Sequence, residues 1–169
     1  MENKHPNKMF MKTAIVTALK GFKNKQYPIG AVVVVDDKVL AASYTTLNLT
    51  GDPSCHAEVN AIRLASKKIN ANKKINAGSW AHNLENAWLY ITMEPCSMCT
   101  SLAIWAGMKG IVYGTNSKTF FKINNMNKNN SRYIFMHPYD VIKNSNPKLK
   151  LYKGFMEKEC DKLLDLYKK

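Results

Sequence analysis

Arginine is scarce in this chain of 169 residues: Arg63 and Arg132 stand against 23 lysines, and the formal net charge at pH 7 is +13. Clustered basic side chains attract the phosphates of nucleic acids. Lysine is spread along the chain, however, and asparagine is also abundant, which indicates an overall bias in composition. The charge is therefore compatible both with a solvated surface and with a patch that faces RNA.

Long apolar runs are absent as well. No stretch approaches the roughly 18 consecutive apolar residues of a membrane span, and the polar start Met1–His5 has no apolar leader region. Four cysteines fit a reducing compartment better than a disulfide framework. Because 46% hydrophobic residues are enough to fill one core, we expect a single domain over residues 1–169. From the lack of a membrane span and of an apolar leader, we expect the protein in the cytoplasm and without a membrane partner.

Apolar residues recur at helical spacing in some segments and form short runs bounded by turn residues in others. We expect irregular loops at about 70–86 and 115–147, the second containing the polar stretch Asn124–Ser131. The order of the elements predicts an α/β fold, a three-layer α-β-α sandwich around a mixed five-stranded sheet. The expected helices are about 8–23, 53–69, 95–107 and 156–167, and the expected strands are 31–35, 39–42, 87–92, 111–113 and 149–152.

Two short motifs carry the chemistry, His56-Ala57-Glu58 and, forty residues later, Pro95-Cys96-Ser97-Met98-Cys99. Asp52 is expected as the N-cap of one helix, with Pro53 at its first position, and Pro95 is expected to open the next helix. His56 and Glu58 would then lie in the first turn of a helix. Two cysteines three residues apart on a helix share a face, so both sulfurs can reach one ion.

The donor set predicts a catalytic zinc site. A structural zinc has four protein ligands, whereas a catalytic zinc has three and leaves the fourth position to water. His56, Cys96 and Cys99 are the three predicted ligands, and Glu58 is the acid left over for proton transfer. A thioredoxin-like dithiol would leave His56 and Glu58 unexplained, and no second Cys-x-x-Cys exists for a zinc ribbon. Glu58 could instead be an acid that stabilises a helix N-terminus.

The H-x-E and P-C-x-x-C motifs resemble those of the cytidine/deoxycytidylate deaminase superfamily, within it the branch of guanine deaminases and tRNA adenosine deaminases. The runs Pro28–Val32, Asp52–Glu58 and Leu89–Cys96 are also similar. The resemblance implies a cytidine deaminase-like fold, one Zn²⁺ per subunit and a homodimer. It also implies hydrolytic deamination, in which zinc makes a hydroxide of its bound water and Glu58 transfers the protons to the ring and the leaving ammonia.

The substrate is less constrained than the chemistry. Relatives commonly place an asparagine eleven residues before the ligand histidine, where this chain has Thr45, with Asn48 three residues later; Thr45, Asn48 and Ala57 are the candidate contacts to the base. His56–Arg63 resembles guanine deaminases, so we expect a guanine-type nucleobase or nucleoside. The alternatives are adenosine in tRNA, a cytosine-type substrate, and a catalytically silent zinc module that binds RNA. Lys118–Lys122, which interleaves bases and aromatic rings, could face RNA or simply pack.

The remaining candidate groups are assigned structural roles. The expected surface histidines are His5, His82 and His137, Cys55 is expected to pack beside the site without being a fourth ligand, and Trp88 and Trp105 are expected in the core.

Overall fold

The computed structural model describes residues 5–70, 84–127, 129–130, 133–134, 136–146 and 148–167. These residues form a mixed five-stranded sheet in the order β2-β1-β3-β4-β5, in which β1 is antiparallel to β2 and β3, whereas β3, β4 and β5 are parallel. The strands are β1 (Gly30–Val35), β2 (Lys38–Tyr44), β3 (Trp88–Met93), β4 (Gly110–Thr115) and β5 (Lys150–Tyr152).

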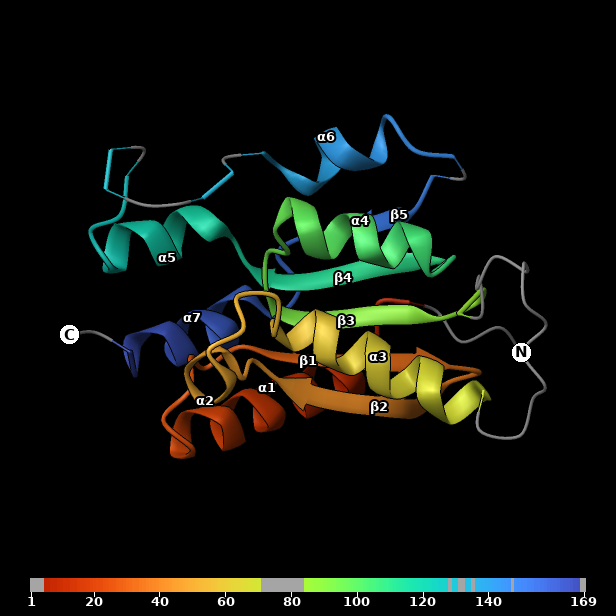
Figure 1. Ribbon diagram of the computed structural model, residues 1–169, viewed down its shortest axis with the longest axis horizontal. Helices are drawn as coiled ribbons and strands as arrows, with labels where there is room; N and C mark the ends of the chain where they lie inside the picture. The colour runs from red at the N-terminus through yellow and green to blue at the C-terminus, as the bar shows by residue number, and fades with distance from the viewer. Residues whose placement is uncertain are drawn as a thin grey trace.

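Helices cover both faces of this sheet. In Figure 1, α3 (Ala57–Asn70) and α4 (Ser97–Trp105) lie in front of it, and α1 (Lys8–Lys23) and α7 (Glu157–Asp165) lie behind it. Successive side chains of a strand point to opposite faces, and β1 is apolar on both. Its Ala31 and Val33 pack in the core under α3, while Val32 and Val34 pack in the core under α1. The predicted three-layer sandwich with a mixed sheet is confirmed.

The hairpin between β1 and β2 turns at residues 36–37, between the strands predicted at 31–35 and 39–42. Asp36 and Asp37 both have positive φ angles, 47° and 58°. Positive φ at both central residues is the backbone of a type I′ turn, which matches the right-handed twist of the two strands, and aspartate tolerates it better than most residues.

The two helices that carry the motifs begin later than the sequence predicts. Residues 53–54 form a turn, and α3 starts only at Ala57, because the Asp52 carboxylate accepts a hydrogen bond from the Ser54 backbone N–H at 2.7 Å and closes a local turn instead of capping a helix. Similarly, Pro95 precedes α4, whose N-cap is Cys96. Glu58 lies in the first turn as expected, whereas His56 lies just before it.

The segment 115–147 is less irregular than expected. It contains α5 (Ser117–Ile123) and α6 (Pro138–Ile142), while the four-residue α2 (Leu47–Thr50) follows β2. The Lys118–Lys122 run lies on α5. Of the two roles considered for this run, facing RNA or packing, the buried Phe121 has the packing role. Most of the predicted loop 70–86, namely residues 71–83 with His82 among them, lies outside the described residues. Residues 128 and 131 of the polar stretch also lie outside them.

Two structural assignments are wrong. Trp105 is 60% exposed, because it is at the last turn of α4 on the side away from the sheet, whereas Trp88 is buried as expected. His5 is not a surface residue: its Nδ1 is 2.7 Å from the hydroxyl of Tyr90, and its ring stacks on Trp88. Among the described helices, none has the length and apolar character needed to cross a membrane.

Candidate active site

The structure brings the three predicted metal ligands together. The Nδ1 atom of His56 lies 3.8 Å from the Cys96 Sγ and 3.5 Å from the Cys99 Sγ, and the three donor atoms all lie within 4.8 Å of one another. His56 stands at the start of α3, where its carbonyl accepts the first helical hydrogen bond from Asn60, and both cysteines stand at the start of α4. Two helix N-termini therefore meet at the donor atoms, and their positive ends favour thiolate ligands.

Hydrogen bonds among these groups shift their pKa values in opposite directions. A hydrogen bond from Cys99 lowers the pKa of Cys96 to about 4, and the same bond raises the pKa of Cys99 well above its ordinary value. The hydrogen bond between His56 and Cys96 raises the pKa of the imidazole. Such a cluster gives up its protons to a cation, since a bound metal deprotonates its thiol ligands.

This donor set fits zinc. One imidazole nitrogen and two thiolates are typical zinc ligands, and three protein ligands leave one position for water, as in catalytic sites. Within the residues that the structure describes, no further histidine, cysteine or carboxylate joins the group, and the neighbouring Cys55 is buried outside it. Zinc held here would supply a Lewis acid that activates water at neutral pH.

Glu58 is the acid beside this cluster. This residue is only 3% exposed, and burial raises its pKa to about 7, while the nearby His56 and a hydrogen bond from the Cys99 thiol act in the opposite direction. A carboxyl group whose pKa lies near neutrality can both accept and release a proton under physiological conditions. Ala57, the residue between His56 and Glu58, is fully buried, and its methyl group is too small to fill the space beside them.

These groups line a cavity of about 60 Å³, which we call the catalytic cavity. Its walls also include Ile29, Thr45, Leu47, Ala57, Ile91, Met93, Glu94 and Tyr133. The Thr45 hydroxyl donates to the Cys55 carbonyl at 3.1 Å, so it is held in the wall. Asn48 is not among the lining residues: it is exposed, and its amide donates to the Lys25 carbonyl at 3.2 Å. Of the candidate base contacts, the structure therefore brings Thr45 and Ala57 to the cavity.

Two of the lining residues, Glu94 and Tyr133, were not predicted from the sequence. Glu94 stands directly before the Pro95-Cys96 pair, so an acid next to a ligand motif was an available signal. It is buried and accepts hydrogen bonds from the Ser117 backbone N–H at 2.7 Å and the Ser117 hydroxyl at 2.8 Å. Tyr133 belongs to the 115–147 segment, where the sequence offers no motif, and its ring packs edge-on against Phe121.

Comparisons with known proteins agree with this geometry. The model of the cytidine and deoxycytidylate deaminase zinc-binding region matches residues 4–115. A tRNA-specific adenosine deaminase of Buchnera aphidicola subsp. Schizaphis graminum is 31% identical over 92% of this chain and 89% of the relative. A guanine deaminase of Bacillus subtilis is 34% identical over 62% of this chain and 61% of the relative. The chain spans only 12% of a chloroplastic tRNA(adenine(34)) deaminase of Arabidopsis thaliana, to which it is 28% identical.

Solved structures share the fold. A structure from a study of A-to-I editing by tRNA:A34 deaminases superposes with a TM-score of 0.66 at 24% identity, over 93% of this chain and 99% of the other. A guanine deaminase from Nitrosomonas europaea superposes with a TM-score of 0.74 at 19% identity, over 94% and 82%. The chain therefore belongs to the cytidine and deoxycytidylate deaminase zinc-binding family, a family of zinc-dependent hydrolytic deaminases of nucleobases and nucleosides.

Proposed function

We propose that this protein deaminates adenosine within a tRNA loop, giving inosine and ammonia. The observation that carries the proposal is the match to a tRNA-specific adenosine deaminase, which is 31% identical over 92% of this chain and 89% of the relative. The net charge of +13 is in keeping with a polyanionic substrate.

In this proposal the chain's own residues have separate tasks. His56, Cys96 and Cys99 hold the zinc ion, and the apolar walls of the catalytic cavity exclude bulk water from the reacting atoms. Glu58 takes a proton from the attacking water, passes it to the ring nitrogen next to the carbon that bears the amino group, and then assists the departure of ammonia. A purely structural zinc site has no use for this buried carboxylate, which argues against a silent RNA-binding module.

A guanine-type base or nucleoside is the second candidate substrate. The similarity of His56–Arg63 to guanine deaminases and the 34% identity to the Bacillus subtilis enzyme favour it. The absence of Asp and Glu from residues 110–139, where guanine deaminases carry acidic residues, speaks against it.

Ammonia release from a panel of substrates tests the proposal. The panel holds guanine, guanosine, adenosine, cytidine and an anticodon stem-loop with adenosine in the loop. We expect turnover of the stem-loop, with binding that falls by about 10³ between 50 and 200 mM salt if six or more phosphates are contacted. Turnover of guanine with little salt dependence and no reaction with the stem-loop would refute tRNA as the substrate.

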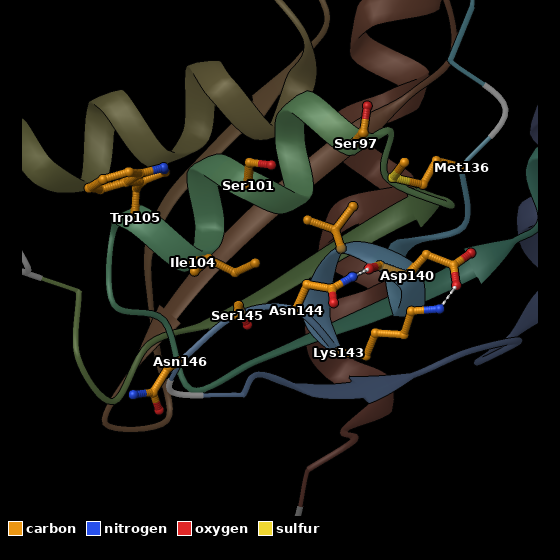
Figure 2. A pocket seen from close by; sticks show the side chains of 11 residues that line it. Ser97, Ser101, Ile104, Trp105, Met136, Asp140, Lys143, Asn144, Ser145 and Asn146 are labelled. Carbon is orange, nitrogen blue, oxygen red and sulfur yellow. Dashed lines mark hydrogen bonds and ion pairs between the residues drawn. The ribbon is translucent and has the colours of Figure 1, made fainter.

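We propose further that two copies of the chain form a homodimer through the outer faces of α3 and α4. Large apolar side chains are exposed there, Leu64 on α3 and Met98 and Trp105 on α4. Figure 2 shows Trp105 on α4, beside a groove of about 850 Å³ that α4 forms with α6. Exposed apolar side chains that gather on one face are typical of surfaces that bind another protein.

A further inference from the structure

A second and larger cavity adjoins the catalytic cavity. It measures about 480 Å³, and it shares two wall residues, Glu94 and Tyr133, with the catalytic cavity. Its other walls come from the end of β4, from α5 and α6, and from the residues after β5, so segments far apart in the sequence meet there. We call it the flanking cavity. The proposed chemistry makes no use of it.

A partly buried hydrogen-bond network holds Glu94, one of the two residues that line both cavities. The Glu94 carboxylate accepts two hydrogen bonds from Ser117 through one oxygen, while its other oxygen lies 3.3 Å from the Nε2 atom of His137. The Nδ1 atom of His137 accepts a hydrogen bond from the Tyr139 backbone N–H at 3.0 Å, so the ring proton is on Nε2, facing Glu94. The negative charge of Glu94 is thereby engaged on both sides.

Two lysines in the wall of the flanking cavity have no such partner. Lys118 comes from α5 and Lys153 from the residue after β5, and both are exposed. Throughout the described ranges, neither ammonium group forms an ion pair. The other carboxylate of the cavity, Asp140, is paired with Lys143 at 2.8 Å, as Figure 2 shows. Two positive charges are therefore left for a ligand.

We propose that the flanking cavity binds the phosphate and sugar that are joined to the target base. The catalytic cavity has room only around the reacting atoms, so the rest of a nucleotide must lie outside it, and the flanking cavity offers neighbouring space together with two unpaired ammonium groups. Phosphate contacts of this kind position a substrate without reading its sequence. This inference rests on the proposed function in one respect, since a tRNA loop supplies the phosphate in a phosphodiester.

Binding of a labelled anticodon stem-loop to the zinc-loaded protein tests the proposal, with Glu58→Gln present in every sample so that the RNA is not consumed. We expect Lys118→Ala and Lys153→Ala each to weaken binding by about 5- to 10-fold and each to lower the salt slope by about one. Lys122→Ala is the matched control, because Lys122 lies on the same helix but outside the cavity wall. Lys12→Ala, on α1 behind the sheet, is a remote control.

If Lys118→Ala and Lys122→Ala weaken binding of the stem-loop equally, the attraction comes from the surface as a whole and the proposal is overturned. Unchanged binding in both Lys118→Ala and Lys153→Ala would also overturn it. A second arm separates this failure from failure of the proposed function. If the stem-loop is neither bound nor deaminated, turnover of guanosine and of guanosine monophosphate is compared. A preference of about tenfold or more for the monophosphate, lost in the Lys118→Ala, Lys153→Ala double variant, would support the cavity as a phosphate site. Equal turnover of both substrates by the parent protein and by the double variant would refute it.

Discussion

Glu58 is the residue on which the proposed hydrolysis depends most directly. Glu58→Gln keeps the shape of the side chain and leaves the three metal ligands in place, so the protein should fold and bind zinc as before. Loss of the proton path should lower kcat by about 10²- to 10⁴-fold. Ammonia release and metal analysis on the same samples measure the two effects. More than about a tenth of the original activity in a zinc-loaded variant would exclude Glu58 as the proton carrier.

Cys99 should link zinc binding to folding. Cys99→Ala removes one of three ligands, so zinc occupancy and thermal stability should fall together, since metal bound only by the folded state adds its binding free energy to stability. Cys160→Ala is the control, because Cys160 is equally buried but lies in the core under α1 and α7, away from the donor cluster. If Cys99→Ala keeps its full zinc content while Cys160→Ala is equally destabilised, Cys99 is not a ligand.

At this scale, what the sequence predicted depended on spacing within short motifs. His56 and Glu58 are two residues apart, and Cys96 and Cys99 three, so a local helical geometry was enough to group them in pairs. The contact between Glu94 and His137 joins residues 43 positions apart through α6, whose placement no local pattern reveals. Asn48 likewise turned away from the cavity because a backbone carbonyl, that of Lys25, took its amide.

Among the elements, β1 and α1 approach each other closely at Gly30. A Cβ atom added at Gly30 would lie 2.3 Å from the Ala14 carbonyl oxygen and 2.5 Å from the Ala18 backbone nitrogen. Backbone atoms inside a helix cannot move aside individually, so Gly30→Ala should push α1 away from the sheet and destabilise the protein by about 1–3 kcal/mol or more. Thermal unfolding measures the loss, with Ala42→Ser on the exposed side of β2 as control. A midpoint within a degree of the parent protein would contradict the close contact.

Element types were predictable where apolar periodicity was long or unbroken, as in α1 and β1. Element starts were not, because Asp52 and Pro53 are equally suited to a turn and to a helix start, and the hydrogen bond to Ser54 decides for the turn. The short helices α5 and α6 escaped prediction since each has few buried positions; in α5 only Phe121 is buried. Their stability comes from tertiary contacts rather than from local propensity.

For the whole molecule, the five strands and the layered arrangement followed from the sequence, whereas the relation between the two cavities did not. Alternation of helices and strands is enough to predict layers. The flanking cavity needs the end of β4, α6 and Lys153 to meet in space, which is a property of the assembled chain. The net charge likewise left open whether any part of the surface binds phosphate, and it did not indicate which lysines could do so.

The assembly of two chains is the last prediction. Leu64, Met98 and Trp105 are 44%, 40% and 60% exposed on the layer formed by α3 and α4, where burial against a second copy would remove their apolar surface from water. Trp105→Lys would place a charge in that interface and should weaken association by at least about tenfold, equivalent to about 1.4 kcal/mol. Val16→Lys is the control, because Val16 is similarly exposed on α1, behind the sheet. Sedimentation velocity at micromolar concentration should show a dimer for the parent and for Val16→Lys, and a shift toward monomer for Trp105→Lys. A monomeric parent protein would refute the homodimer, and dissociation caused by Val16→Lys alone would place the interface away from α3 and α4.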